Sequence, residues 1–213
     1  MSAASAAFLR EWRLKARGGG WAAAVGLFAV AGGLAPLALG RDPEFLAAAG
    51  PAILWLSAIL SLLIGLDGLY EEDFRTGGLA VYRLSPLPFP LVMLIKTAAA
   101  WCATCLPLVL IAPVLLIAFG AEDPVSGTLG FLLGTPGLAL LAAALGALCA
   151  GMRRGTALIV FLALPLLTPA LVFGPASAGA SPMVPLLILG AFSLQALALS
   201  PFIASAALKA QMA

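Results

Sequence analysis

Stretches without a charged residue alternate with short charged segments along the whole chain. These stretches cover residues 18–40, 45–66, 97–121, 124–152 and 155–208. As one helix, the last would be about 80 Å long, far beyond the roughly 30 Å hydrocarbon core of a bilayer, so it must fold back. Residues 174–182, Gly-Pro-Ala-Ser-Ala-Gly-Ala-Ser-Pro, are rich in turn-forming residues and predict the break.

Six membrane-spanning helices follow from this pattern, because about 20 apolar residues cross a bilayer as a helix. We expect them at residues 21–40, 45–66, 91–119, 127–151, 156–173 and 184–206. The predicted fold class is therefore an all-α polytopic membrane protein, in which residues 1–213 form a single transmembrane domain. The one substantial loop covers residues 67–90.

Composition supports this class and excludes others. Of 213 residues, 63% are hydrophobic and 9% are charged, whereas a soluble domain is about 45–50% apolar and 25% charged. The net charge of +2 is too small to favour nucleic-acid binding. The chain has no His, the commonest metal ligand and general base, so we expect it to hold no metal and no cofactor of its own.

The distribution of basic residues predicts the orientation in the membrane. With the N-terminus inside, ten of the eleven basic residues fall on the cytoplasmic side and Arg41 alone falls outside. Such a bias is typical of cytoplasmic loops. We therefore expect both termini in the cytoplasm, and we expect no cleavable signal peptide.

Residues 2–17 have the pattern of an amphipathic helix. Wound as a helix, its arginines lie on one side, and the opposite side carries the apolar residues Phe8, Leu9, Trp12 and Ala16. Leu14 lies outside this apolar side. This pattern favours a helix in the membrane interface, anchored by Arg10, Trp12 and Arg13. The alternative is a basic anchor for the first span only.

The loop at residues 67–90 concentrates the acidic residues of the chain. Asp67, Glu71, Glu72 and Asp73 fall within seven positions, on the side where basic residues are favoured. Such acids would be repelled by anionic lipid and project into the cytosol, where a basic partner could bind them. A solvated connector explains them equally well. The chain has no phosphate-binding loop of the G-x-x-x-x-G-K-[ST] type, so any ATP would be used by a partner.

Two further motifs have a structural and a functional interpretation. Gly130 and Gly134 form a GxxxG pair, which indicates a helix-packing or dimer seam or else a chance pairing, and Pro136 predicts a kink. Cys102 and Cys105 form a C-x-x-C motif, with Cys149 on the next span. Packing of small side chains explains these cysteines better than redox or metal chemistry, because further ligands are lacking.

A series of motifs in order along the chain resembles the cytochrome c-type biogenesis haem exporter protein B (CcmB) family, which belongs to the ABC-2-type permeases. The likeness covers the second span to the C-terminus. The matching residues are Leu66, Asp67, Asp73-Phe74, Gly77-Gly78-Leu79, Leu84-Ser85-Pro86-Leu87-Pro88, Leu94-Ile95-Lys96, Trp101, Gly134-Thr135-Pro136, Arg153-Arg154-Gly155, Leu164-Pro165-Leu166-Leu167-Thr168-Pro169 and residues 200–208.

The resemblance implies a homodimer that acts with a cytosolic ATP-binding subunit, CcmA, and with CcmC, CcmD and the haem chaperone CcmE. ATP and Mg would be bound by the partner, so this chain would be a non-catalytic subunit. The ATPase-coupling element would comprise Asp67, Tyr70, Glu71, Glu72, Asp73, Phe74, Gly77, Gly78 and Leu79. Ala80 stands where the family commonly has Glu, so the element differs there.

Haem would be handled by the complex, through export or through release of the haem-loaded chaperone. The lack of His and the few Met residues favour release, because this chain offers little to ligate iron. The alternative is an ABC-2-type permease for a drug, a lipid or a polysaccharide.

Overall fold

The computed structural model describes residues 3–40, 42–66, 69–70, 73, 87–150 and 155–211, with the backbone alone for residues 3, 149 and 155–164. This part of the chain contains seven helices and no strands. They are α1 (Ala3–Arg17), α2 (Gly20–Leu39), α3 (Pro43–Leu66), α6 (Phe89–Ala118), α7 (Pro124–Cys149), α8 (Gly155–Ala176) and α9 (Met183–Gln211). Each expected helix has its counterpart.

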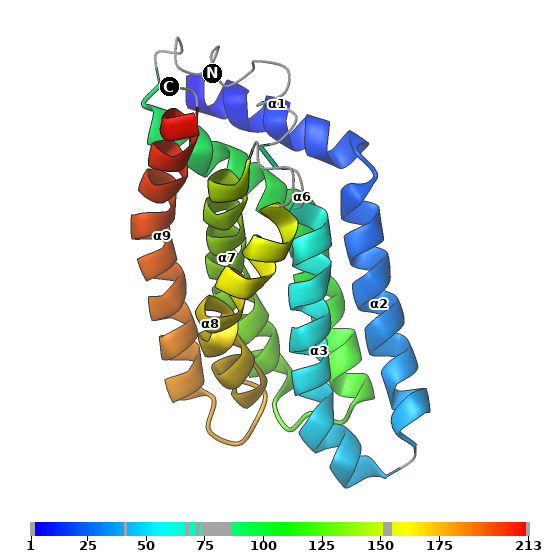
Figure 1. Ribbon diagram of the computed structural model, residues 1–213. Coiled ribbons are helices and arrows are strands. Elements are labelled where there is room, and N and C mark those ends of the chain that lie inside the picture. The colour runs from blue at the N-terminus through cyan, green and yellow to red at the C-terminus, as the bar shows by residue number, and fades with distance from the viewer. Residues whose placement is uncertain are drawn as a thin grey trace.

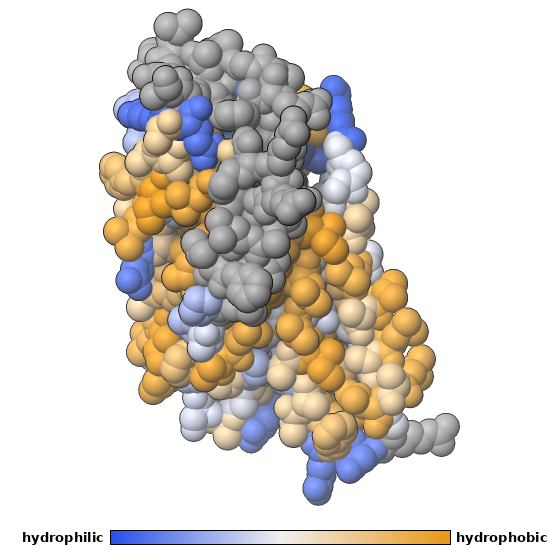
Figure 2. Space-filling view, in the orientation of Figure 1, coloured by the Kyte–Doolittle hydropathy of each residue, from blue (hydrophilic) through white to orange (hydrophobic). Residues whose placement is uncertain are grey.

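The helices form a bundle with one crosswise helix at its end (Figure 1). Helices α2, α3, α6, α7, α8 and α9 run along the bundle, while α1 lies across the end where both labelled termini are found. Helix α6 contacts α1, α2, α3, α7 and α9 and is the central element. On the coloured part of the face in Figure 2, hydrophobic residues lie mostly along the two sides and the lower half, and hydrophilic residues gather mostly toward the two ends.

Five of these helices are long and apolar enough to cross a membrane: α2, α3, α6, α7 and α9. Residues 165–176 of α8 form a further apolar helical segment. Large apolar side chains such as Leu37, Leu110 and Leu194 are exposed on the bundle, as expected where lipid is the solvent. The chain is thus a multi-pass membrane protein.

Glycines let an aromatic core form in the half of the bundle away from α1. The indole of Trp55 on α3 stacks on Phe131 of α7, with ring centroids 4.5 Å apart. The Phe131 ring also makes an edge-to-face contact with Phe28 of α2. A β-carbon on Gly134 or Gly174 would collide with this indole. The two glycines therefore seat Trp55 between α7 and α8.

Gly174 corrects one sequence-based expectation. We expected residues 174–182 to break the chain between two spans, but α8 continues to Ala176 and only residues 177–182 lie between α8 and α9. Gly174 serves the close approach of Trp55 rather than a turn. Pro175 lies inside α8, one residue before its end, where it has no N–H to donate to the helix.

The GxxxG pair packs within the chain. A β-carbon on Gly130 would collide with Ser177, and one on Gly134 with Trp55. Both glycines also lie close to Leu189 of α9. These close contacts join α7 to α3, to α9 and to Ser177, all within one chain.

Pro136 lies inside α7, where it lacks an N–H for the helix. The hydroxyl of Ser193 on α9 accepts a hydrogen bond from Gly137 N at 2.9 Å and donates one to the carbonyl of Leu133. A neighbouring helix thereby satisfies backbone groups that a membrane interior would leave unpaired. This exchange fastens α9 to α7 at the proline.

Candidate functional site

Helix α1 carries one buried acidic residue among its basic ones. Glu11 is 5% exposed and turns toward α6, whereas Arg13 and Arg17 are exposed. Trp12 is 41% exposed and Leu14 is 54% exposed, in keeping with a helix lying in the membrane interface. Ala3–Arg17 thus form the expected helix, but its buried position is Glu11, whereas Trp12 and Ala16 of the expected apolar side are exposed together with Leu14.

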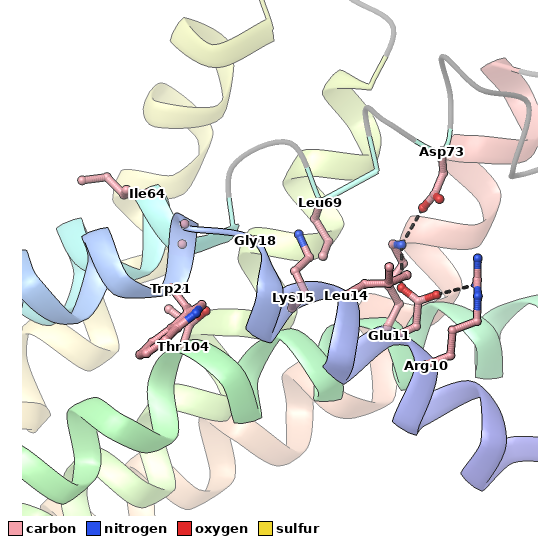
Figure 3. A pocket seen from close by; sticks show the side chains of 13 residues that line it. Arg10, Glu11, Leu14, Lys15, Gly18, Trp21, Ile64, Leu69, Asp73 and Thr104 are labelled. Atoms are coloured by element: carbon pink, nitrogen blue, oxygen red, sulfur yellow. Dashed lines mark hydrogen bonds and ion pairs between the residues drawn. The ribbon is translucent and has the colours of Figure 1, made fainter.

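Four charged residues from three parts of the chain meet beneath α1, and we call them the Lys96 cluster: Arg10, Glu11, Asp73 and Lys96. Lys96 Nζ lies 2.9 Å from Glu11 Oε2 and 2.6 Å from Asp73 Oδ2. Arg10 contacts the other oxygen of Glu11 at 2.9 Å. Figure 3 shows this chain of contacts. The four formal charges sum to zero.

Lys96 belongs to α6 and lies about two turns from its start. Its side chain is only 7% exposed. An ammonium group at this depth needs nearby counter-charges, because burial of an unpaired ion costs several kcal/mol. Glu11 and Asp73 supply them from elements distant in sequence, and thereby hold α1 and the residues after α3 against α6.

A second contact holds the residues after α3 against α6, at Thr97, the residue that follows Lys96. The hydroxyls of Tyr70 and Thr97 lie 3.3 Å apart, and Thr97 also donates to the carbonyl of Met93. Leu69 and Tyr70 are both buried. Burial raises the pKa of Tyr70 to about 12, against the smaller opposing effects of the Thr97 hydrogen bond and Lys96. Leu69, Tyr70 and Asp73 form what we call the post-α3 segment.

A pocket of about 540 Å³ lies beside the Lys96 cluster. Its walls come from α1, α2, α3, α6 and the post-α3 segment, and they include Lys15, Trp21, Leu69 and Thr104 (Figure 3). The Trp21 indole N–H donates a hydrogen bond of 2.8 Å to the carbonyl of Ala16. This bond braces the turn between α1 and α2. Helix α1 is thus attached to the bundle over an incompletely filled space.

The structure places only part of the expected coupling element. Tyr70 and Asp73 lie against α6, while Asp67, Glu71, Glu72, Phe74, Gly77, Gly78 and Leu79 lie outside the described residues. The expectation that all four acids project into the cytosol is wrong for Asp73, because this carboxylate pairs with Lys96. A role of the element in ATPase coupling stays a prediction.

The two cysteines whose side chains are described, Cys102 and Cys105, both lie on α6. Cys105 is fully buried, Cys102 is partly buried, and both are free thiols. No group of three or more potential His, Cys, Asp or Glu ligands occurs among the described residues. Neighbouring Thr104 packs against Gly65, where a β-carbon would collide with its methyl group. This is a packing environment.

Sequence reasoning missed the roles of Glu11 and Lys96. A signal for each was present: Lys96 falls inside an expected span, and Glu11 is the only acidic residue in the first 40 positions. Each isolated charge requires a partner at membrane depth. Their pairing across 85 positions could not be derived from local pattern.

Comparisons with known proteins agree with the resemblance noted in the sequence. The family model described as CcmB protein matches residues 2–211. The chain is 40% identical to heme exporter protein B of Paracoccus denitrificans, with 97% of this chain and 99% of that protein covered. It is 36% identical to heme exporter protein B of Rhodobacter capsulatus over 95% and 97% of the two chains. The protein of the same name in Escherichia coli K12 is 40% identical over 83% of each chain. On this evidence, the chain belongs to the CcmB family.

Proposed function

We propose that this chain is the membrane subunit of an ABC transporter for cytochrome c biogenesis. The observation that carries the proposal is its similarity, over nearly the whole length, to proteins named heme exporter protein B. In this proposal the chain is not itself an enzyme. Its partner CcmA binds ATP and Mg in the cytosol, and haem is the cargo of the complex.

The proposed topology has six spans, both termini in the cytoplasm and the protein in the bacterial inner membrane. The sixth span is α8, whose 22 residues include no charged side chain and would extend about 33 Å. Helix α1 would lie at the cytoplasmic surface, in agreement with its arginines and with the termini at the same end (Figure 1).

The proposed mechanism uses the loop at residues 67–90 as the contact with the ATPase. Glu71 and Glu72 would bind basic residues of CcmA, while Tyr70 and Asp73 join this element to α6 through Thr97 and Lys96. Two copies of the chain would work with two ATPase subunits, CcmC, CcmD and the chaperone CcmE. Because the chain contains no His, we favour release of the haem-loaded chaperone over passage of haem through this subunit.

The test is the variant Glu71→Lys/Glu72→Lys, compared with Glu122→Lys at the other end of the bundle. The first should lose co-purification of CcmA in detergent, stimulated ATP hydrolysis and cytochrome c maturation, whereas Glu122→Lys, an exposed site, should keep all three. Retention of CcmA by the double variant would contradict the coupling role. Stoichiometric haem bound to this chain and CcmA alone would contradict the preference for chaperone release.

A further inference from the structure

We propose that Lys96 is a positioning residue that makes α1 and the post-α3 segment move as one unit. The inference rests on the proposed function, since it concerns how movement produced by an ATPase would reach the membrane domain. It assigns α1 the role of a second moving element, in addition to its place in the membrane interface.

The first argument is the sharing of one cation by two carboxylates. Lys96 Nζ contacts Glu11 Oε2 at 2.9 Å and Asp73 Oδ2 at 2.6 Å, and the Glu11 and Lys96 side chains are each 7% exposed. The two carboxylates depend on one buried ammonium, so Lys96 cannot follow Asp73 without leaving Glu11, within the cluster, to the exposed Arg10 alone. Because an unpaired buried carboxylate is costly, a displacement of Asp73 that carries Lys96 with it favours displacement of Glu11 as well.

The second argument is the arrangement of attachments along α6. Asp73 and Tyr70 hold the post-α3 segment at Lys96 and Thr97, which are adjacent residues, and Glu11 holds α1 at the same lysine. A shift of the post-α3 segment therefore acts on the very side chain that retains α1. The connection is a direct contact and requires no long path through the core.

The third argument is that α1 has both a joint and room to move. Gly18 and Gly19 connect α1 to α2 in a turn that the Trp21–Ala16 hydrogen bond braces, and a β-carbon on Gly19 would meet open space. Glycine permits backbone rotation that other residues resist. The pocket of about 540 Å³ beneath α1 means that a tilt of the helix sacrifices few close contacts on that side (Figure 3).

The experiment measures the position of α1 by electron–electron spin distances in the complex with the ATPase, in lipid nanodiscs. Spin labels are placed at Ala6→Cys on α1 and Val125→Cys at the opposite end, both exposed positions, after replacement of Cys102, Cys105 and Cys149 by Ala. Distances are compared without nucleotide and with ATP. The labelled parent should show an ATP-dependent shift of α1.

Two variants test the role of the shared cation. Glu11→Gln releases α1 alone, and Glu11→Gln/Lys96→Met/Asp73→Asn removes the three central charges together, so that no buried ion of the trio is left unpaired. Both should bind the ATPase and lose the shift. Lys96→Arg, which keeps the cation, should retain the shift that the triple variant loses, and Arg17→Gln, which removes an exposed cation from the same helix, should retain it too.

Each remaining outcome overturns the inference. If the shift persists in both test variants, the Lys96 cluster is a static brace. If the parent stimulates ATP hydrolysis but α1 does not move, the inference fails while the proposed function stands. If the parent does not bind the ATPase at all, both fail.

Discussion

Trp55 and Lys96 are both large, buried side chains at the meeting point of three elements, yet their surroundings are opposite in kind. Trp55 is 1% exposed, stacked on Phe131 and seated on two glycines, in the half of the bundle away from α1. Lys96 is held by two carboxylates beside a pocket of about 540 Å³ beneath α1. Apolar contacts hold the surroundings of Trp55 together, whereas ion pairs hold those of Lys96 together.

This difference indicates which half of the molecule can rearrange. Separation of the interlocked rings and glycines is costly, because close-packed interiors lose dispersion contacts when their groups move apart. Ion pairs can exchange partners if the net charge stays balanced, and an adjacent pocket supplies space. We infer that the Trp55 half holds the helices in register while the Lys96 half changes shape.

The strongest way to break the comparison is to remove Trp55. Trp55→Ala should destabilise the protein by about 3–5 kcal/mol, because it leaves a large cavity against Phe131. At about 2–4 °C per kcal/mol for a chain of this size, the melting temperature in detergent should fall by roughly 10 °C. Trp12→Ala, which removes a half-exposed indole from α1, is the control and should change it little.

The next largest effect tests the close contact between Trp55 and Gly174. Gly174→Ala places a β-carbon against the indole and should cost about 1–3 kcal/mol through overpacking. Gly190→Ala in α9 meets open space and should be neutral or stabilising by up to about 1 kcal/mol. Equal melting temperatures for the two variants would show that the seat is loose.

At the other end, Tyr70 sharpens the comparison through pH. Tyr70→Phe should cost about 1 kcal/mol at neutral pH by loss of the Thr97 hydrogen bond. Burial raises the pKa of Tyr70 from 10.0 to about 12. Its contribution to stability is therefore complete below pH 10 and is lost as the pH rises toward 12, since the unfolded chain ionises first.

The measurement uses the tyrosinate absorption band, because the chain has only two tyrosines. In the Tyr82→Phe variant, the tyrosinate band comes from Tyr70 alone and should appear near pH 12. In the Tyr70→Phe variant, the free energy of unfolding should fall less between pH 10 and 12 than in the parent. Titration of Tyr70 near pH 10 would mean that the post-α3 segment is open to water.

The helices themselves were predictable because lipid burial excludes charge, and the gaps between charged residues therefore mark the spans. The exception at the C-terminus has a physical reason: α9 continues past the expected residue 206 to Gln211. Lys209 lies at 5.7 Å from the ring centroid of Phe89. A long cationic side chain can thus stay near the interface while its helix continues.

The candidate site was predictable only in part, since its central contacts join distant residues. The acidic run indicated residues 67–73, but not that Asp73 turns inward while Glu11, on a basic helix, supplies the matching carboxylate. Likewise, the sequence around Gly174 predicts a turn, whereas in the structure this glycine makes room for the indole of Trp55. Local pattern specifies the elements, whereas these roles depend on what meets them in space.

The smallest predicted effect lies between the two ends, at the contact of α6 with α7. The Trp101 indole N–H donates to Thr135 Oγ1 at 3.1 Å, and the Thr135 hydroxyl donates to the carbonyl of Phe131. Thr135→Val removes both bonds, whereas Thr128→Val removes only the same local bond on the same helix, to Pro124. The difference between the two variants isolates the interhelical bond. It should be about 0.6 kcal/mol, the average for such bonds in membranes, or roughly 1–2 °C in melting temperature. A difference several times larger would mean that this polar contact, and not the aromatic core, keeps α6 and α7 together, and the division of the bundle into a rigid and a mobile half would have to be redrawn along that contact.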